Sequence, residues 1–357
     1  MHYYKYLSPV IFRFSPEVAH NLALHALKHG FVPPQRAIDH PALRMQVGGV
    51  SFRNPLGLAA GFDKNGEVAA ALFDQGFGFI EAGSVTPQPQ EGNAKPRMFR
   101  LREDEALINR LGFNNEGVDA VKLHLAKQRK RLDKARLSGG ALGVNIGKNK
   151  TSEDAVADYL SMFDAVSGIA DYITVNISSP NTEGLRDLQE ASALGQLLDA
   201  LCNRREQLSV NVPLWLKIAP DLTDEQSEAV AQTVKNYPID ALVISNTTTE
   251  RPASLIGQHK AEQGGLSGKP LMIPSTARLR LFYKLVGDQI PLVGVGGIAS
   301  AEDAYAKIRA GASLVQLYTA LAYQGFGLVR DINAGLLDLL KQDGYSHIKE
   351  AIGAHAK

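Results

Sequence analysis

The chain has 357 residues, but it contains a single cysteine and almost no net charge. One cysteine cannot form an internal disulfide, which excludes a disulfide-stapled scaffold and suits a reducing compartment. The formal net charge is +1, so no overall field recruits nucleic acid, and we expect no nucleic-acid partner. No apolar run approaches the roughly 18 residues that a transmembrane helix requires. Lys5, Pro9 and Arg13 interrupt the N-terminal segment, so it has no signal-peptide core.

Two kinds of catalytic constellation are also missing. No His, Cys and carboxylate residues show the spacing of a metal site, so the sequence predicts no metal. No pair of carboxylates is placed as in a glycosidase. The one cysteine, Cys202, falls within a helical apolar pattern over residues 194–206, and we interpret it as a packing residue.

The sequence is rich in short apolar stretches that end in polar groups. Residues 172–186 read YITVNISSPNTEGLR, a buried-strand pattern followed by amides and hydroxyls, and Pro180 cannot continue a sheet ladder. Alone, this would be a polar turn after a core strand. Seven similar stretches occupy residues 54–61, 79–85, 141–147, 214–219, 241–248, 292–298 and 314–320. Helical patterns separate most of them, so the sequence predicts an α/β fold, a (β/α)8 TIM barrel, with its active site at the strand ends.

The first 44 residues differ from the barrel because they are basic and aromatic. Ser15 and Pro16 predict a helix start and Gly30 its end, with an apolar stripe between them. We therefore predict two parts: an amphipathic N-terminal helical hairpin extension over residues 1–44 and a catalytic barrel over residues 45–357. The hairpin either rests on a membrane surface or closes the bottom of the barrel, and its composition alone favours neither.

Five side chains are expected at strand tips: Lys64, Asn145, Asn176, Lys217 and Asn246. A desolvated ammonium needs a partner, so lysines in apolar strands indicate a bound anion. Amide groups offer donors and acceptors that suit the edges of a planar heterocycle. A lysine near such a ring can stabilise negative charge that develops on its reduction.

Two glycine-rich turns, residues 263–268 and 294–298, precede the pair Tyr318 and Thr319. Barrels commonly bind phosphate through backbone N–H groups of the loops after strands 7 and 8, so this order predicts a phosphate site. A long excursion after the second strand contains the amide-rich residues 108–115, which predict a wall of a substrate pocket. Residues 122–137 predict one highly charged, solvent-facing helix.

Ten motifs in order resemble the dihydroorotate dehydrogenases of the membrane-associated, quinone-reducing class 2. They are FDKNGE, GSVTPQPQEGN, INRLGFNN, GVNIGKNK, NISSPNTEGLR, KIAPDL, SNTT, GGLSGKP, GVGGI and GASLVQLYTAL. The similarity runs from about residue 45 to 325, and the N-terminal hairpin is similar to that class as well. Class 1 relatives use a cysteine as base, whereas the SSPN segment here offers only serines.

The resemblance implies FMN over the barrel and oxidation of dihydroorotate to orotate in pyrimidine (UMP) biosynthesis. It implies that Ser179 takes a proton from substrate C5 while hydride passes from C6 to flavin N5. The implied substrate residues are Lys64, Asn109, Arg110, Leu111, Gly112, Phe113, Asn176, Asn181, Asn246 and Thr247. The implied FMN residues are Ala60, Gly61, Phe62, Asp63, Lys64, Ser84, Asn145, Asn176, Lys217, Ser245, Gly268, Gly297, Tyr318 and Thr319. Ser84 and Ser245 stand where many relatives have Thr, and both keep the hydroxyl.

The resemblance also implies a membrane quinone, ubiquinone or menaquinone, as electron acceptor. Its implied route runs between the two N-terminal helices, past His20, to Arg100 and Tyr318. Because the sequence starts at Met1 without a targeting segment, we expect peripheral association with the cytoplasmic face of a bacterial inner membrane, with the mitochondrial inner membrane as the alternative. Two other interpretations stay open: a flavin-free barrel isomerase or lyase acting on a phosphorylated substrate, and a non-catalytic membrane-surface module.

Overall fold

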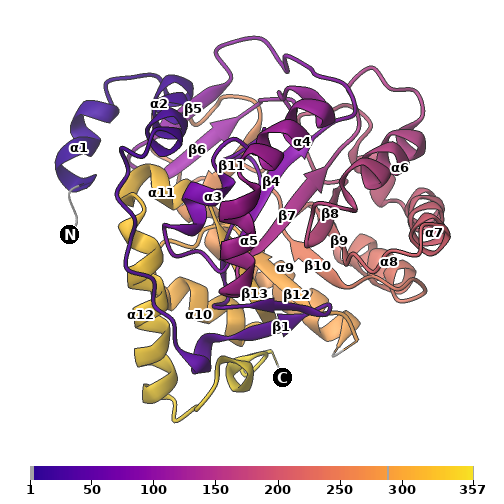
Figure 1. The fold of residues 1–357 in the computed structure, drawn as a ribbon. Coiled ribbons are helices and arrows are strands. Elements are labelled where there is room, and N and C mark those ends of the chain that lie inside the picture. The colour runs from indigo at the N-terminus through magenta and orange to yellow at the C-terminus, as the bar shows by residue number, and fades with distance from the viewer. Residues whose placement is uncertain (1–3, 288, 357) are drawn as a thin grey trace.

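The computed structural model describes residues 4–287 and 289–356, and in them eight parallel strands close into a barrel (Figure 1). Around the barrel, the strands follow one another in the order β10-β12-β13-β3-β4-β7-β8-β9. Their bounds are β3 (Leu56–Leu58), β4 (Phe79–Val85), β7 (Ala141–Ile146), β8 (Tyr172–Asn176), β9 (Leu214–Ile218), β10 (Ala241–Ile244), β12 (Leu292–Val295) and β13 (Ala312–Leu317). All eight predicted stretches form strands, which confirms the TIM barrel. The predicted stretches at 241–248 and 292–298 are longer than β10 and β12, because their polar and glycine-rich ends leave the ladder.

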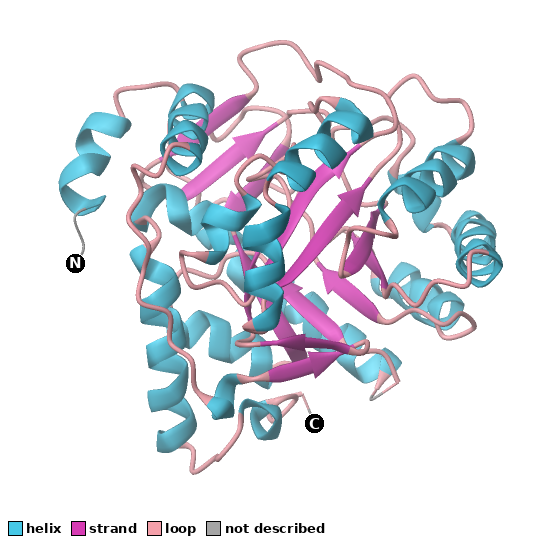
Figure 2. Ribbon diagram, viewed as in Figure 1, coloured by secondary structure: helices cyan, strands magenta, loops and turns pink. Residues whose placement is uncertain are grey.

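Helices lie on the outside of the barrel (Figure 2). Their bounds are α3 (Ala69–Phe73), α4 (Gly117–Lys127), α5 (Arg129–Leu137), α6 (Ala155–Val166), α7 (Ala191–Gln207), α8 (Asp224–Val234), α9 (Met272–Val286), α10 (Ala301–Arg309), α11 (Thr319–Gln324) and α12 (Gly327–Gln342). Short 3-10 turns occupy η1 (Pro41–Leu43), η2 (Arg186–Gln189), η3 (Lys269–Leu271) and η4 (Ile348–Ala351). Cys202 lies buried in α7, which confirms its interpretation as a packing residue.

The prediction of one helix over residues 122–137 is wrong. The segment is divided between α4 and α5, which meet at Gln128. The Gln128 side chain accepts a hydrogen bond from Ala70 N–H at 3.0 Å and donates to Gly66 O at 2.7 Å. The two helices are also not purely solvated, because Leu125 and Leu132 are buried.

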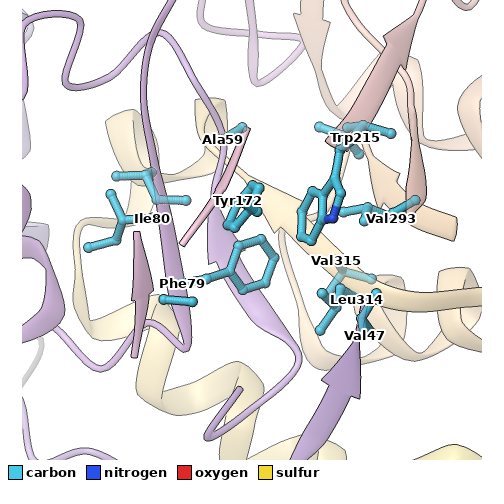
Figure 3. Close-up of a cluster of buried hydrophobic side chains, with 14 of the residues drawn as sticks. Val47, Ala59, Phe79, Ile80, Tyr172, Trp215, Val293, Leu314 and Val315 are labelled. Atoms are coloured by element: carbon cyan, nitrogen blue, oxygen red, sulfur yellow. The ribbon is translucent and has the colours of Figure 1, made fainter. Parts of the chain in front are cut away.

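An aromatic layer fills the amino-terminal end of the barrel. The hairpin of β1 (Met45–Val47) and β2 (Val50–Phe52) packs there, and Phe52 contacts Phe79 with ring centroids 5.3 Å apart. Tyr172 stacks on Trp215 at 3.7 Å and an interplanar angle of 21°, and Figure 3 shows both rings gathered with Phe79. A Cβ at Gly143 would lie 2.1 Å from the Tyr172 ring, so this layer needs the glycine. With the barrel closed here, ligands reach it from the carboxyl ends of the strands.

A second, three-stranded antiparallel sheet stands at the carboxyl end. It contains β5 (Met98–Leu101), β6 (Ala106–Asn109) and β11 (Gly265–Gly268) in the order β11-β6-β5. The prediction of a glycine-rich turn over residues 263–268 is therefore corrected: most of it is an edge strand. Gly265 permits β11 to approach the loop after β10 closely, because a Cβ there would meet Thr247 Oγ1 at 1.9 Å.

The N-terminal extension consists of α1 (Tyr4–Ile11) and α2 (Pro16–Lys28), beside the three-stranded sheet (Figure 1). Ser15 and Pro16 start α2 as predicted, although the Ser15 side chain makes no capping hydrogen bond. Tyr4 in α1 donates to Ala322 O in α11 at 2.8 Å, and α2 packs against β5. The helices thus lie near the carboxyl ends of the barrel strands, which contradicts a cap at the barrel bottom. Residues 1–3 of the predicted extension lie outside the described residues.

Candidate active site

Most of the predicted site residues line one cavity at the carboxyl ends of the barrel strands. From the predicted substrate set, these are Lys64, Asn109, Leu111, Gly112, Phe113, Asn176, Asn181, Asn246 and Thr247. From the predicted FMN set, they are Ala60, Gly61, Ser84, Lys217, Ser245, Gly268, Gly297, Tyr318 and Thr319. Ser179, the predicted base, lines the same cavity. The barrel strands and the β5–β6–β11 sheet thus bring distant motifs to one place.

Besides Asp63, three residues of the predicted substrate and FMN sets do not line this cavity. The Arg110 side chain turns away, donating to Glu262 at 2.8 Å and stacking over the Phe99 ring at 4.6 Å. Phe62 is buried against an aromatic cluster. Asn145 is fully buried below the cavity lining, where its side chain hydrogen-bonds to Asn176 and Glu81. The side chains of these three residues therefore shape the site without lining it.

Asp63 is a local structural anchor. Its carboxylate accepts the Glu67 and Val68 backbone N–H groups at 2.8 and 2.9 Å. Burial raises the pKa of Asp63 to about 6, although these two hydrogen bonds oppose the rise. The carboxylate thereby fixes the loop that presents Lys64.

A buried polar network supports the cavity from below. Asn176 Nδ2 donates to Ser84 Oγ at 2.9 Å and to Asn145 Oδ1 at 3.1 Å. Asn145 Nδ2 in turn donates to Glu81 at 2.7 Å, and Gln316 donates to the other Glu81 oxygen at 2.8 Å. Because a partly satisfied buried network is unfavourable, these linked bonds fix the orientation of the amides above them.

Glu81 is the functional residue that the sequence analysis missed. It is fully buried in β4 and faces the inside of the barrel, where it holds Asn145 and partly offsets the lowering of the Lys217 pKa by burial. The signal was present, because a glutamate inside the apolar stretch of residues 79–85 needs a partner for the same reason as a lysine does. Apolar lining residues such as Leu271 and Val295 were also missed, and nothing in the sequence distinguishes them from core.

The two lysines of the cavity have depressed pKa values. Lys217 is buried in β9, and burial lowers its pKa although Glu81 opposes the shift. Among the described residues, no acceptor lies within hydrogen-bonding distance of its Nζ. Lys64 borders the cavity half-buried and donates to Gly61 O at 2.9 Å, and burial lowers its pKa to about 8. Both ammonium groups would be stabilised by an anionic or carbonyl-bearing ligand.

The serines of the SSPN segment differ sharply in their environment. Ser178 is fully buried, and its hydroxyl donates to Asn176 Oδ1 at 2.8 Å and accepts from Asn246 Nδ2 at 3.0 Å. Ser179 lines the cavity, and its Oγ accepts the Asn181 N–H at 3.3 Å. In the described part of the chain, no side chain accepts the Ser179 hydroxyl proton. Only Ser179 therefore offers its hydroxyl to a ligand.

Glycines make one wall of the cavity out of backbone. Gly296 and Gly297 follow β12 with φ of +106° and +82°, and a Cβ at Gly297 would lie 2.4 Å from Met272 N. Gly268, which also lines the cavity, has φ of +97°. Thr319 Oγ1 donates to Ser267 Oγ at 2.9 Å beside this wall. Exposed backbone and hydroxyl groups of this kind can bind a phosphate, so these residues fit the phosphate end of FMN.

The predicted quinone residues lie between the N-terminal helices and the cavity. His20 in α2 contacts the Phe62 ring at 5.2 Å, and its Nδ1 lies 3.3 Å from the Tyr318 hydroxyl, which also borders the cavity. Burial lowers the pKa of His20 to about 3, so the imidazole is neutral near pH 7. Arg100 in β5 does not line the cavity. Its guanidinium lies over the ring of Phe12, 4.6 Å from the centroid, and Phe12 belongs to the loop between α1 and α2.

One potential metal cluster lies outside the cavity. Atoms of Glu67, Glu116 and His124 that could ligate an ion lie within 4.8 Å of one another. The sequence analysis did not connect them, because the loop before α3 brings Glu67 to α4. Lys28 donates to Glu67 at 3.4 Å, so this carboxylate already has a cationic partner.

A barrel that collects enclosed lysines, ordered amides and a backbone-lined wall at its strand ends is a (β/α)8 enzyme that holds an anionic, planar ligand. The comparisons identify the family. The family model described as dihydroorotate dehydrogenase matches residues 42–340. The chain therefore belongs to the dihydroorotate dehydrogenase family.

Relatives and solved structures agree with this placement. A protein of Azorhizobium caulinodans named dihydroorotate dehydrogenase (quinone) is 49% identical over 358 residues, covering 99% of both chains. The mitochondrial dihydroorotate dehydrogenase (quinone) of Mus musculus is 47% identical, covering 99% of this chain and 90% of its own. The crystal structure of DHODH from Eimeria tenella in complex with ferulenol has a TM-score of 0.93, 40% identity and 96% coverage of both chains.

The chain is thus a quinone-dependent, class 2 oxidoreductase that oxidises dihydroorotate to orotate in pyrimidine biosynthesis, with FMN as cofactor. This result contradicts the flavin-free isomerase and the non-catalytic module. Within residues 4–287 and 289–356, none of the helices combines the length and the apolar character needed to cross a bilayer.

Proposed function

We propose that Ser179 is the base of this reaction and takes the proton from C5 of dihydroorotate. The observation that carries the proposal is the contrast between neighbouring serines: Ser179 opens to the cavity, while both hydrogen-bonding directions of Ser178 are used. FMN, held by Lys217 and the glycine wall, would supply the acceptor for the hydride that leaves C6 of the substrate. Asn181 N–H donates to Ser179 Oγ and so keeps this hydroxyl oriented.

The remaining cavity residues divide into two groups. Lys64 and the amides of Asn109, Asn181 and Asn246 hold the substrate, because an ammonium and amide groups match a carboxylate and a ring with carbonyl and N–H edges. Asn109 and Asn181 are already linked, with Asn181 Nδ2 donating to Asn109 Oδ1 at 3.2 Å. Lys217 and the glycine wall hold FMN. The loop over residues 182–189 excludes water, and it is anchored by the Arg186–Asp221 ion pair at 2.8 Å.

The test compares the two serines. A positioned base typically contributes about 10²–10⁴-fold, so Ser179→Ala slows flavin bleaching by dihydroorotate by roughly that factor near neutral pH. Orotate binding and FMN content persist, because the substituted side chain holds neither. Ser179→Cys restores part of the rate and moves its rise with pH toward the thiol pKa of about 8.5. Should Ser178→Ala abolish bleaching while Ser179→Ala does not, the assignment is refuted.

The N-terminal helices form the membrane-resting surface and the quinone entrance in this proposal. Their solvent-facing side carries Tyr6, Leu7, Val10, Phe14, Val18 and Leu22, all exposed. Such an apolar face with flanking Lys5 and Arg13 suits the interface of an anionic membrane. A quinone that enters between α1 and α2 meets Arg100, His20 and Tyr318. We place the enzyme peripherally on the cytoplasmic face of a bacterial inner membrane.

A further inference from the structure

We infer that Lys307 is a positioning residue for the FMN phosphate: its buried ammonium supplies positive charge from behind the glycine wall of the cavity. The inference rests on the proposed placement of the phosphate at Gly296 and Gly297. Lys307 does not line the cavity, so its charge acts on the phosphate through the residues that separate the two groups.

The Lys307 side chain runs beneath the end of β12. The residue lies in α10 and is fully buried. A Cβ at Gly294 would lie 3.2 Å from Lys307 Cδ, so the lysine stem passes directly under this strand. Its Nζ donates to Ser275 Oγ at 2.7 Å and to Thr276 Oγ1 at 3.1 Å, both in the first turns of α9. The ammonium therefore ends under the start of α9.

The same start of α9 backs the glycine wall. Met272 packs so closely on Gly297 that a Cβ there would meet it at 2.4 Å. Ser275 Oγ lies 3.1 Å from Gly296 O as well as 2.7 Å from Lys307 Nζ. One hydroxyl group thus separates the ammonium from the turn that faces the cavity.

The charge of Lys307 has no counter-charge in direct contact. Among the described residues, no carboxylate lies within 4.0 Å of Nζ, and the two hydrogen-bond partners are neutral hydroxyls. Asp303 on the same helix is the ionisable group that favours the charged form, whereas burial lowers the pKa of Lys307 to about 7. From β12, Gly294 faces the side chain and carries no charge.

A purely structural role does not explain this arrangement. A buried ammonium without an anion is unfavourable, and an apolar side chain of similar length would fill the same space. A phosphate dianion on the other side of the wall supplies the missing negative charge at short range and low dielectric. Lys307 thereby favours the phosphate of FMN over a ligand that lacks one.

The experiment compares FMN with riboflavin, which lacks the phosphate. Lys307→Met removes the charge, and Lys307→Gln removes it while retaining a donor for the two hydroxyls. Lys284→Met, on the exposed side of α9, is the matched control for a lost surface charge. We expect the dissociation constant for FMN to rise at least about tenfold in both Lys307 variants, the factor that corresponds to one pKa unit of interaction. The constant for riboflavin stays unchanged, as do both constants in the control.

A second readout uses the holoenzyme. The phosphorus NMR signal of bound FMN reports the ionisation of its phosphate, whose second pKa is ordinarily about 6. In the wild-type protein the dianion persists below that pH, and in the Lys307 variants its titration moves upward. Equal weakening of FMN and riboflavin with an unchanged titration would make Lys307 a packing residue and overturn the inference. Full FMN affinity in Lys307→Gln would overturn it too, whereas wild-type protein that binds no FMN would instead refute the proposed function.

Discussion

Lys64→Met tests whether the enzyme keeps a substrate-binding charge at the expense of stability. The pKa of Lys64 is lowered from 10.5 to about 8 by burial. A shift of this size corresponds to about 3 kcal/mol at neutral pH, and water at the half-buried side chain reduces it to about 2 kcal/mol. Methionine keeps the stem but loses the hydrogen bond to Gly61 O, worth about 1 kcal/mol. We therefore expect the variant to gain roughly 1 kcal/mol in free energy of unfolding near pH 7.

The pH dependence of the stability difference tests separately whether the charge of Lys64 destabilises the folded protein. Because the folded-state pKa of Lys64 is lowered, the destabilisation is fully present below about pH 8 and disappears as the pH rises toward 10.5. The electrostatic contribution should thus fall from about 2 kcal/mol at neutral pH to roughly 1 kcal/mol near pH 9.5. There it only offsets the lost hydrogen bond, so the net stability difference between variant and wild type should approach zero. Urea unfolding of the FMN-loaded enzyme without orotate, at about pH 7 and about pH 9.5, measures this stability difference. The surface variant Lys235→Met is the control.

The same substitution should weaken orotate binding. A hydrogen bond to a charged group contributes about 1.5–3 kcal/mol, so the dissociation constant rises about 10- to 150-fold. The electrostatic reasoning is refuted if the Lys64→Met variant is less stable than wild type at neutral pH and the stability difference between the two proteins does not change at high pH. Unchanged orotate affinity refutes the role of Lys64 in substrate binding.

One further prediction concerns the cofactor, and two concern the membrane. Lys217→Ala should weaken FMN retention or slow flavin reduction, because the side chain lines the cavity without a hydrogen-bond partner among the described residues; full retention and rate contradict its assignment. Removing residues 1–44 should leave flavin bleaching by dihydroorotate intact while long-tailed quinones no longer restore the colour efficiently, and binding to anionic vesicles should fall. Replacing Leu7 and Leu22 by Glu should weaken vesicle binding in the intact chain, with Leu137→Glu as the exposed control. Undiminished reduction of long-tailed quinones by the truncated protein would contradict a quinone entrance at the hairpin.

The barrel was predictable because its strands are buried on both faces. Each one therefore shows as an apolar run that stops at a polar or glycine residue, as at Asn176 and Gly296. The site followed from the same pattern, since the carboxyl ends of parallel strands meet at one end of a barrel. Lys217 was identifiable because an ammonium inside such a run needs a partner.

The errors arose where the structure depends on contacts between distant residues. Residues 265–268 look like a turn because they are glycine-rich, yet they pair with β6, which lies 156 to 162 residues earlier in the chain. The helix over residues 122–137 breaks at Gln128, whose partner Ala70 is 58 residues away. Arg110 sits inside a recognisable motif, but its side chain is captured by Glu262, which no local pattern reveals.

The buried lysines show why these contacts matter for function. Lys64, Lys217 and Lys307 all have pKa values lowered by burial, so each one destabilises the ligand-free protein when charged. Lys64 and Lys217 line the cavity, and Lys307 lies behind its glycine wall. A hydrophobic core alone has no need for any of them. We propose that their partners are anions: the substrate carboxylate for Lys64, negative charge on the reduced flavin ring for Lys217, and the phosphate for Lys307. Stability given up in the empty protein is recovered on binding, which is the expected relation between a preorganised site and the ligands that it holds.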